Sequence, residues 1–288
     1  MASASTSSGA LRSRRTVCAE WAISQRNVPI DGDSGKLSTI LKKYRERGGA
    51  SVLRLLGEAR GVNLTIHKGL PLASGLGSSA ASAVARAMAV NALLNAPLSK
   101  GDLLPACLDG EEMVSGRHAD NVAPCLFGGI TLVYGTDASQ VVQLPIPANL
   151  YLALVTPAVE VPTRKAREAL PPTVSLRTMV AQTAGVARLV DSIHRGDLEA
   201  MAAAMESDGV IEPARQSLMP LLAEIRATAK AAGALGAISG AGPTLCAVCA
   251  GEAVAQKGDG GDARRLRAGG DSCQSRWTQV ASEGARTL

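Results

Sequence analysis

A glycine- and serine-rich loop that runs straight into a long helix constrains the fold of this chain more than any other feature. The loop reads PLASGLGSSA, residues 71–80. Before it, VNLTIHK at residues 62–68 alternates apolar and polar side chains and predicts a half-buried strand. After it, residues 78–95 are rich in alanine and contain no glycine or proline. This pattern predicts a helix that is apolar nearly all round and therefore buried.

Several kinds of glycine loop compete at this position. A flexible linker would lead into another irregular segment, and this loop leads into a helix. Gly75, Gly77 and Ala80 match G-x-G-x-x-A, but Pro71 separates the strand from the loop and no acidic residue follows about 20 residues later. A Walker loop needs a Gly-Lys-Ser/Thr ending, which is absent. What remains is a loop whose backbone N–H groups and helix dipole meet phosphate.

The composition limits the classes of partner. Hydrophobic residues make up 46% of the chain and charged residues 19%, which is typical of a globular protein. Aromatic residues make up only 2%, so the core must be aliphatic. The net charge of +5 is modest and the basic residues are scattered, which argues against nucleic-acid binding. No apolar stretch approaches the roughly 20 residues that span a bilayer, so we expect no membrane partner.

The six cysteines are too sparse for a disulfide scaffold. Cys246 and Cys249 form a C-x-x-C, but no second pair or nearby histidine completes a zinc site. Both lie in the apolar run TLCAVCA, which predicts a buried strand, so we expect inert core thiols.

The N-terminus differs from the rest of the chain. MASASTSSGALRSRRTVCA is rich in serine, alanine and arginine and has no acidic residue before Glu20, which is typical of an organelle transit peptide. A disordered tail is the alternative. The rest of the first 50 residues predicts only a short helix at residues 37–46.

Strands and helices along the chain predict an α+β fold. Ser99 and Asp102 resemble a capping box that opens a second helix, which Pro105 and Gly110 are expected to disturb. Residues 257–275 are glycine-rich and charged and predict a loop. Further strands are predicted at residues 128–135, 141–146, 150–157, 235–239 and 244–250, and further helices at residues 163–170, 176–194, 198–205 and 213–232.

Two glycine motifs resemble a known family. PLASGLGSSAASAVARAMAVN resembles the second motif of the GHMP kinases, the family of galactokinase, homoserine kinase, mevalonate kinase and phosphomevalonate kinase. AISGAGPT at residues 237–244 resembles that family's third motif. SGRHADNVAPCLFGGI, PTRKAREALP and GVIEPARQSLMP are similar to homoserine kinases, especially the plant type. The resemblance extends over residues 62–250.

The resemblance implies a GHMP-kinase-like two-layer α+β fold, with a ribosomal S5-like N-terminal part and a ferredoxin-like C-terminal part. It implies a leader and non-matching segment at residues 1–50, an ATP-binding domain at residues 51–146 and a C-terminal domain at residues 147–288. The family's first motif, P-x-x-x-N-L-G-x-G-F-D, is absent from the first 50 residues. We therefore expect an incomplete N-terminal part, and the C-terminal tail also diverges.

The same resemblance implies ATP and Mg²⁺ as cofactors. It gives Ser79 and Glu111 as Mg²⁺ ligands, with Glu112 as the competitor of Glu111. Oxygen donors suit this ion. The residues that it implies for ATP are Pro71, Leu72, Ala73, Ser74, Gly75, Leu76, Gly77, Ser78, Ser79 and Ala80.

Homoserine presents an ammonium, a carboxylate and a hydroxyl group. By resemblance, Asp120 accepts the ammonium, and Arg167 and Arg215 match the carboxylate bidentately. Arg164 competes with Arg167, and surface charges are the alternative for these arginines. Asn121 orients the substrate or the loop.

Two further features of this site stay open. Whether Asp120 also takes the hydroxyl proton is open, and a lone loop histidine, His118, is more often structural. Gly240 and Gly242 let the backbone approach the substrate or the phosphates, or form a tight turn.

The expected function is ATP-dependent phosphorylation of homoserine in threonine biosynthesis. The alternatives are a truncated, inactive relative and a GHMP kinase for another small hydroxylated substrate. The resemblance further implies a homodimer and, if the leader is a transit peptide, a plastid stroma location; otherwise the location is cytoplasmic. Release of ADP with homoserine, mevalonate, galactose or threonine distinguishes the enzyme from the inactive relative.

Overall fold

The computed structural model describes residues 18–24, 48–59, 61–219, 221–231, 233–260 and 273–287. The predicted transit segment up to residue 17 and the predicted helix at residues 37–46 lie outside them. The chain divides into two units. The first unit comprises Met1–Leu70, Gly77–Gln143 and Glu283–Leu288, and the second comprises Pro71–Leu76 and Leu144–Ser282. These units do not test the domain boundaries predicted at residues 50 and 146, which stay predictions.

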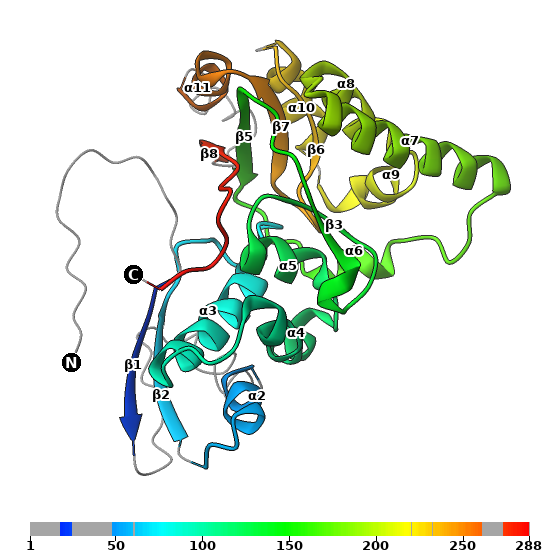
Figure 1. Ribbon diagram of the computed structural model, residues 1–288. Helices are drawn as coiled ribbons and strands as arrows, with labels where there is room; N and C mark the ends of the chain where they lie inside the picture. Colours follow the sequence, from blue (N-terminus) through cyan, green and yellow to red (C-terminus); the bar gives the residue numbers. More distant parts are fainter. Residues whose placement is uncertain are drawn as a thin grey trace. The chain divides into compact units, whose positions relative to one another are not determined.

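The buried alanine-rich helix organises the first unit. This helix, α3 (Ser78–Leu93), packs against α2 (Gly48–Leu55), α4 (Lys100–Ser115) and α5 (Ala119–Phe127) (Figure 1). The core is aliphatic, as the composition predicts, and its largest fully buried side chains include Leu103, Leu104, Leu108, Leu126, Val84 and Val90.

Helix α3 ends two residues before the predicted end. Asn95 and Ala96 have φ values of 66° and 52°, which are incompatible with a right-handed helix. The Asn91 side chain closes the turn, because its Nδ2 donates to the Leu98 carbonyl (2.9 Å) and its Oδ1 accepts from the Leu98 N–H (3.1 Å).

Helix α4 confirms the capping box and corrects the expected disturbance. The Ser99 side chain accepts from the Asp102 N–H, and the Asp102 side chain accepts from the Ser99 N–H. The helix runs unbroken through Pro105 and Gly110. Pro105 lacks the N–H that would donate to the Gly101 carbonyl, so the helix loses one internal bond near its start but continues. A Cβ at Gly110 would lie 3.0 Å from the Ala83 Cβ, so this glycine allows α4 to approach α3 closely.

Within the described residues, the first unit contains two two-stranded sheets. In one, β1 (Cys18–Ser24) pairs antiparallel with β2 (Gly61–His67), the predicted strand before the loop. No local pattern in the sequence predicted β1, whose pairing partner lies about 40 residues away along the chain. In the other sheet, β3 (Ile130–Val133) pairs with β4 (Val141–Leu144). Strand β3 begins two residues later than predicted, because Gly128 and Gly129 have positive φ, and it also ends two residues earlier.

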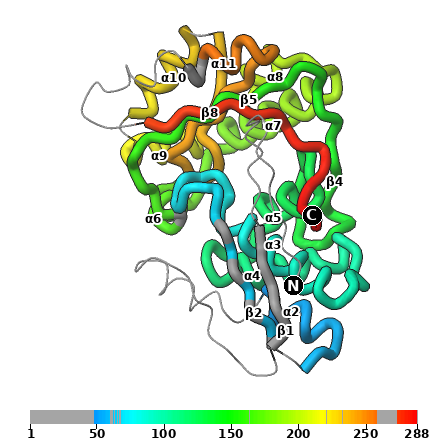
Figure 2. Tube along the Cα trace, turned by 90° about the vertical axis from the view of Figure 1, so that its left-hand side faces the viewer, coloured from blue at the N-terminus to red at the C-terminus, as the bar shows by residue number. Residues whose placement is uncertain are grey.

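The second unit contains a four-stranded sheet. Its strands are β5 (Leu150–Pro157), β6 (Leu235–Ile238), β7 (Leu245–Ala250) and β8 (Cys273–Gln279), in the spatial order β6-β7-β5-β8. All neighbours are antiparallel, and Figure 2 shows β8 alongside β5. Helices follow β5, and α11 (Glu252–Gly260) connects β7 to β8. This βαββαβ order is ferredoxin-like, which confirms the α+β prediction.

Part of the predicted loop at residues 257–275 is regular structure, so this prediction was wrong at both ends. Residues 257–260 complete α11 and residues 273–275 begin β8; the intervening residues lie outside the described chain. In the same sheet, burial raises the pKa of the Cys249 thiol and raises that of Cys246 to about 12. Both thiols therefore stay protonated at neutral pH, as expected for inert core cysteines.

The helical stretch of the second unit has one unexpected break. Helices α6 (Thr163–Glu168), α7 (Leu176–Arg195) and α8 (Leu198–Met205) lie close to their predicted positions. The single helix predicted at residues 213–232 is instead α9 (Ile211–Arg215), a 3₁₀ turn and α10 (Leu222–Ala231). Met219 has φ −135° and ψ 73°, and a proline follows it in the sequence, which disfavours helical backbone before it.

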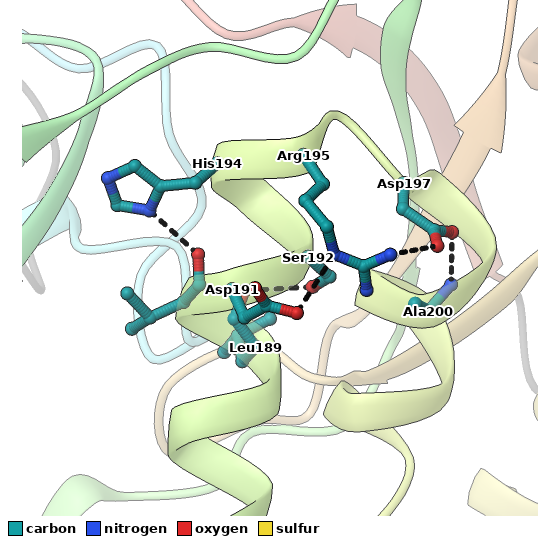
Figure 3. A network of polar contacts seen from close by, with 8 residues as sticks. Leu189, Asp191, Ser192, His194, Arg195, Asp197 and Ala200 are labelled. Atoms are coloured by element: carbon teal, nitrogen blue, oxygen red, sulfur yellow. Dashed lines mark hydrogen bonds and ion pairs between the residues drawn. The ribbon is translucent and has the colours of Figure 1, made fainter.

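His194 lies at the junction between α7 and α8, where its contacts are local (Figure 3). Gly196, with φ 67°, ends α7, and Asp197 caps α8 by accepting from the Ala200 N–H (2.9 Å). Arg195 pairs with Asp197 (3.3 Å). The His194 Nδ1 contacts a backbone carbonyl one turn earlier, so this ring is engaged locally at the helix end. No helix in the described part of the chain has the length and apolar character required to cross a membrane.

Candidate functional site

In the second unit, the two glycine motifs pack backbone against backbone. The Thr244 N–H donates to the Ser74 carbonyl (3.2 Å), and the Ser239 hydroxyl donates to the Gly75 carbonyl (3.0 Å). Gly75 has φ 79°, and a Cβ there would overlap the Ser239 carbonyl oxygen. The contact therefore requires glycine at position 75, and it joins segments about 165 residues apart.

Gly240 and Gly242 form the turn that receives this loop. Their φ values are 56° and 80°. The Gly242 N–H donates to the Ser239 carbonyl (2.9 Å), and a Cβ at Gly242 would overlap the end of the Met219 side chain. The tight-turn interpretation is therefore confirmed, and close approach of a ligand to this backbone stays a prediction.

In the first unit, the loop continues into the N-terminus of α3. Gly77 is the N-cap residue with φ 68°, and no side chain caps the helix. The first turn contains no acidic residue, and the first intrahelical bond runs from the Ala81 N–H to the Gly77 carbonyl (2.9 Å). The amides of Ser78, Ser79 and Ala80 have no partner within the helix, so they can donate to an anion.

A buried carboxylate lies directly beside this helix start. Glu111 on α4 is only 3% exposed, and its Oε1 accepts hydrogen bonds from the hydroxyls of Ser79 (2.7 Å) and Ser115. Its other oxygen, Oε2, is buried and has no hydrogen-bond partner among the described residues. The competitor Glu112 is exposed and lies 3.8 Å from Arg117. The geometry thus favours Glu111 as a metal ligand.

The surroundings of Glu111 act on its charge in opposite directions. Burial raises the pKa of this carboxyl group above its ordinary value. The hydrogen bonds from Ser115 and Ser79 lower it, nearby Asp120 raises it, and Lys68 lowers it. A bound hard cation would stabilise the negative charge of this buried carboxylate and would use its unpartnered oxygen as a ligand.

Asp120 and Asn121 lie in the first turn of α5, in the same unit. The Asn121 Oδ1 lies 3.6 Å from the position that a Cβ on Gly77 would occupy, so this side chain lies beside the glycine loop. Asp120 is exposed, and its Oδ1 accepts from the Asn121 N–H (3.0 Å). His118 is the exposed N-cap residue of α5 and makes no capping side-chain bond.

The three candidate substrate-binding arginines, all in the second unit, differ in environment. Arg215 is 9% exposed; its Nε donates to the Ala166 carbonyl (3.0 Å) and its Nη1 to the Gly240 carbonyl (2.8 Å). These two bonds tie Arg215 to the glycine turn and to α6, and its role in binding a carboxylate stays a prediction. Burial is the main cause that lowers the pKa of Arg215. Arg167 is exposed, and its nearby positive charge lowers this pKa further. Arg164 is 89% exposed and pairs with Glu168 (2.8 Å).

Lys68, which directly follows β2, was not among the predicted site residues. Its Nζ lies 3.4 Å from the Ser78 hydroxyl and 3.5 Å from the Ser78 carbonyl oxygen. Burial lowers the pKa of Lys68, as does Arg86, while Glu111 raises it. The available signal was a lone lysine at the end of the strand that enters the loop.

Two family models match the chain. Residues 38–129 match the GHMP kinases N terminal domain, and residues 189–259 match the GHMP kinases C terminal domain. The homoserine kinase of Methanopyrus kandleri is 43% identical over 213 residues, which is 71% of this chain and 70% of that protein. The homoserine kinase of Arabidopsis thaliana is 40% identical over 224 residues, which is 76% of this chain and 60% of that protein.

Solved structures are similar over nearly the whole chain. A homoserine kinase from Cytophaga hutchinsonii has a TM-score of 0.85 and 38% identity, covering 92% of this chain and 86% of that chain. Mevalonate kinase of L. major, in complex with R-mevalonate, has a TM-score of 0.71 at 18% identity, covering 94% of this chain and 88% of that chain. The second likeness concerns the fold alone.

Proposed function

The chain belongs to the homoserine kinases of the GHMP kinase family, and on that premise we propose that it phosphorylates L-homoserine with ATP. The terminal phosphoryl group of ATP moves to the side-chain hydroxyl, the hydroxyl proton is released, and the products are ADP and O-phospho-L-homoserine, a step of threonine biosynthesis. The observation that supports this most is the buried Glu111 beside Ser79, in the first turn of the helix that follows the glycine loop. Phosphoryl transfer depends mainly on positioning and on stabilising charge.

We propose that residues 71–80 bind the phosphates of ATP. The uncapped amides of Ser78, Ser79 and Ala80 would donate to phosphate oxygens, and the positive end of the α3 dipole would favour their negative charge. Gly75 and Gly77 allow the backbone to take the positive φ values that this path requires.

We propose Ser79 and Glu111 as the Mg²⁺ ligands. The unpartnered Oε2 of Glu111 and the Ser79 hydroxyl are hard oxygen donors, so the residues present fit this ion. No group of three or more His, Cys, Asp or Glu side chains that could hold a metal ion occurs in the described part of the chain, so phosphate and water oxygens would complete the shell. When bound, Mg²⁺ neutralises negative charge on the phosphoryl oxygens.

The substrate contacts are proposals for each residue separately. Asp120 is exposed, so its carboxylate is available to accept the homoserine ammonium. Arg167 and Arg215 would provide guanidinium donors for the carboxylate. Asn121, beside Gly77, would help to orient the hydroxyl toward the phosphoryl group.

Release of ADP and mass-spectrometric detection of the phosphorylated acceptor test the proposed activity. We expect ADP and O-phosphohomoserine in stoichiometric amounts with homoserine, and little ADP with mevalonate, galactose or threonine. Turnover of another acceptor in preference to homoserine would identify a different substrate. A folded preparation that releases no ADP with any acceptor would identify the inactive relative instead.

Two further properties are proposals of the same account. We propose a plastid stroma location, because the N-terminal segment is acid-free and arginine-bearing; a fluorescent fusion of residues 1–24, expressed in plant cells, tests it. We also propose a homodimer. Helix α7 exposes Leu176, Met179, Val180 and Val186, which are 71%, 51%, 58% and 56% exposed, and light scattering on the purified chain tests the mass.

A further inference from the structure

We propose that Lys68 is a ligand of the ATP phosphates and supplies the cation that the glycine loop lacks in its own sequence. The inference rests on the proposed function, because it concerns the same nucleotide. A Walker loop carries a lysine at its end, and residues 71–80 contain none. In the structure, the lysine that follows β2 comes back to the first turn of α3.

The hydrogen bonds that Lys68 makes within the protein are too weak to give it a structural role. Its Nζ is 3.4 Å and 3.5 Å from the two oxygens of Ser78, at the outer limit of hydrogen bonding. The Ser78 carbonyl already accepts a shorter bond from the Ser82 hydroxyl (2.8 Å). The ammonium group, which has three donors, is therefore only weakly engaged by the protein.

The electrostatics of the free protein disfavour a cation at this place. The N-terminus of a helix has partial positive charge, so it stabilises anions and repels cations. Buried Arg86 adds positive charge that acts on Lys68. Among the described residues, no carboxylate lies within ion-pair distance of the Lys68 Nζ, and Glu111 acts on it only through the longer-range electrostatic attraction.

A polyphosphate resolves this conflict. Its negative charge would face the positive helix end and the ammonium group together, and both would donate to phosphate oxygens. Local conflicts of this kind are expected at functional sites. Lys68 thus lies where a phosphate held by the amides of Ser78 and Ser79 can receive a further donor.

The test compares Lys68→Met and Lys68→Arg with Lys100→Met. Lys100 also begins a helix, but there Asp102 completes a capping box. Titration calorimetry should show that Lys68→Met binds Mg·ATP about 10- to 100-fold more weakly, the loss expected for one charged hydrogen bond. Lys68→Arg should recover most of this affinity, and Lys100→Met should bind like wild type.

Two readouts separate ligand binding from a structural role. Without nucleotide, Lys68→Met should unfold at a Tm no lower than that of wild type, and its KM for homoserine should change less than threefold. A lower Tm in the free variant, or Mg·ATP affinity within twofold of wild type, would overturn the inference. Wild type that phosphorylates homoserine while Lys68→Met binds ATP normally would refute this inference alone; wild type that binds no Mg·ATP would refute the proposed function as well.

If Lys68→Met does not fold, a labelling experiment on the wild-type protein tests the same proposal. Acetylation by a soluble active ester, followed by mass spectrometry of peptides, reports the access of each lysine. Mg·ATP should slow labelling of Lys68 at least fivefold and leave Lys100 unchanged. Equal labelling of Lys68 with and without Mg·ATP would overturn the proposal.

Discussion

Two adjacent carboxylates on α4, Glu111 and Glu112, differ in burial, and burial separates their roles. Glu111 faces the start of α3 and accepts from Ser79, whereas Glu112 is exposed near Arg117. The α-helical period turns neighbouring residues by 100°, so only one of the two can face a given neighbour. The sequence could therefore narrow the metal ligand to a pair, and packing decides between them.

Replacing Glu111 by Gln should remove most of the activity. The amide keeps the shape of the side chain but loses the charge that would hold Mg²⁺, so we expect kcat to fall by about 100-fold or more. Glu112→Gln, on the exposed side of the same helix, should keep kcat within twofold. Steady-state kinetics over a range of Mg²⁺ concentrations measures both, and equal effects of the two variants would contradict the assignment.

The arginines of α6 offer a matched pair for the substrate carboxylate. Arg167→Ala should raise the KM for homoserine by about tenfold or more, the loss expected for a hydrogen bond between charged groups, with the affinity for Mg·ATP nearly unchanged. Arg164→Ala should have little effect, because Arg164 is 89% exposed and pairs with Glu168. A larger effect of Arg164→Ala would exchange their roles.

The residue types of the candidate site were predictable, whereas their partners were not. The glycine motif and Ser79 can be read directly from the sequence. Lys68 precedes the motif and approaches Ser78 only because the chain turns back after β2. Arg215 was predicted as a carboxylate ligand, and its two bonds to backbone carbonyls depend on tertiary packing.

At the scale of elements, the contact between the two glycine motifs predicts a severe effect of a single methyl group. Gly75→Ala places a Cβ against the Ser239 carbonyl oxygen at φ 79°, so we expect a loss of at least about 2 kcal/mol in the free energy of unfolding. Gly196→Ala has a similar φ of 67° and no atom within 4 Å, so it should lose only about 1 kcal/mol.

Urea unfolding of both variants measures the difference. Equal losses would mean that backbone strain alone, and not the contact with Ser239, restricts position 75.

Helix α9 carries Arg215, and the Asp208 carboxylate accepts hydrogen bonds from the N–H groups at the start of this helix. Burial alone would raise the pKa of Asp208, but bonds from the N–H groups of Val210, Ile211 and Glu212 and from Gln182 hold it below its ordinary value. Asp208→Ala should therefore lower the free energy of unfolding by about 1–2 kcal/mol at pH 7.

The pH dependence of this loss follows from the sign of the shift. Because the folded pKa is lower than the unfolded value near 3.9, the contribution is present above that value and is lost as the pH falls through the folded pKa. The difference between wild type and Asp208→Ala should stay constant from pH 8 to about pH 5 and shrink below about pH 4. A difference that grows with acidity would contradict this origin.

The elements that the sequence predicted correctly have strong local signals, and the errors lie where tertiary packing decides. Alternating and alanine-rich runs predicted β2 and most of α3. Pro105 and Gly110 looked like helix breakers, but the capping box holds the start of α4 and Gly110 allows α3 to pack closely. Strand β1 shows itself only through its pairing with β2.

At the scale of the whole molecule, the α+β class follows from the order of strands and helices. The βαββαβ connectivity of the second unit adds the sheet order, which the sequence alone did not specify. The last helix and strand of this connectivity were not predicted. The glycine-rich run at residues 257–275 resembles a loop, although its ends belong to α11 and β8. A glycine-rich, charged composition therefore does not exclude helix or strand where tertiary packing stabilises these elements.

Hydrogen exchange at the start of α3, with and without Mg·ATP, tests the central claim most directly. The amides of Ser78, Ser79 and Ala80 have no partner within the helix, so they should exchange quickly in the free protein and at least tenfold more slowly with saturating Mg·ATP. The start of α4, whose amides the capping box already engages, should not change. Unchanged exchange at residues 78–80 with saturating Mg·ATP would contradict the claim that this backbone binds the phosphates.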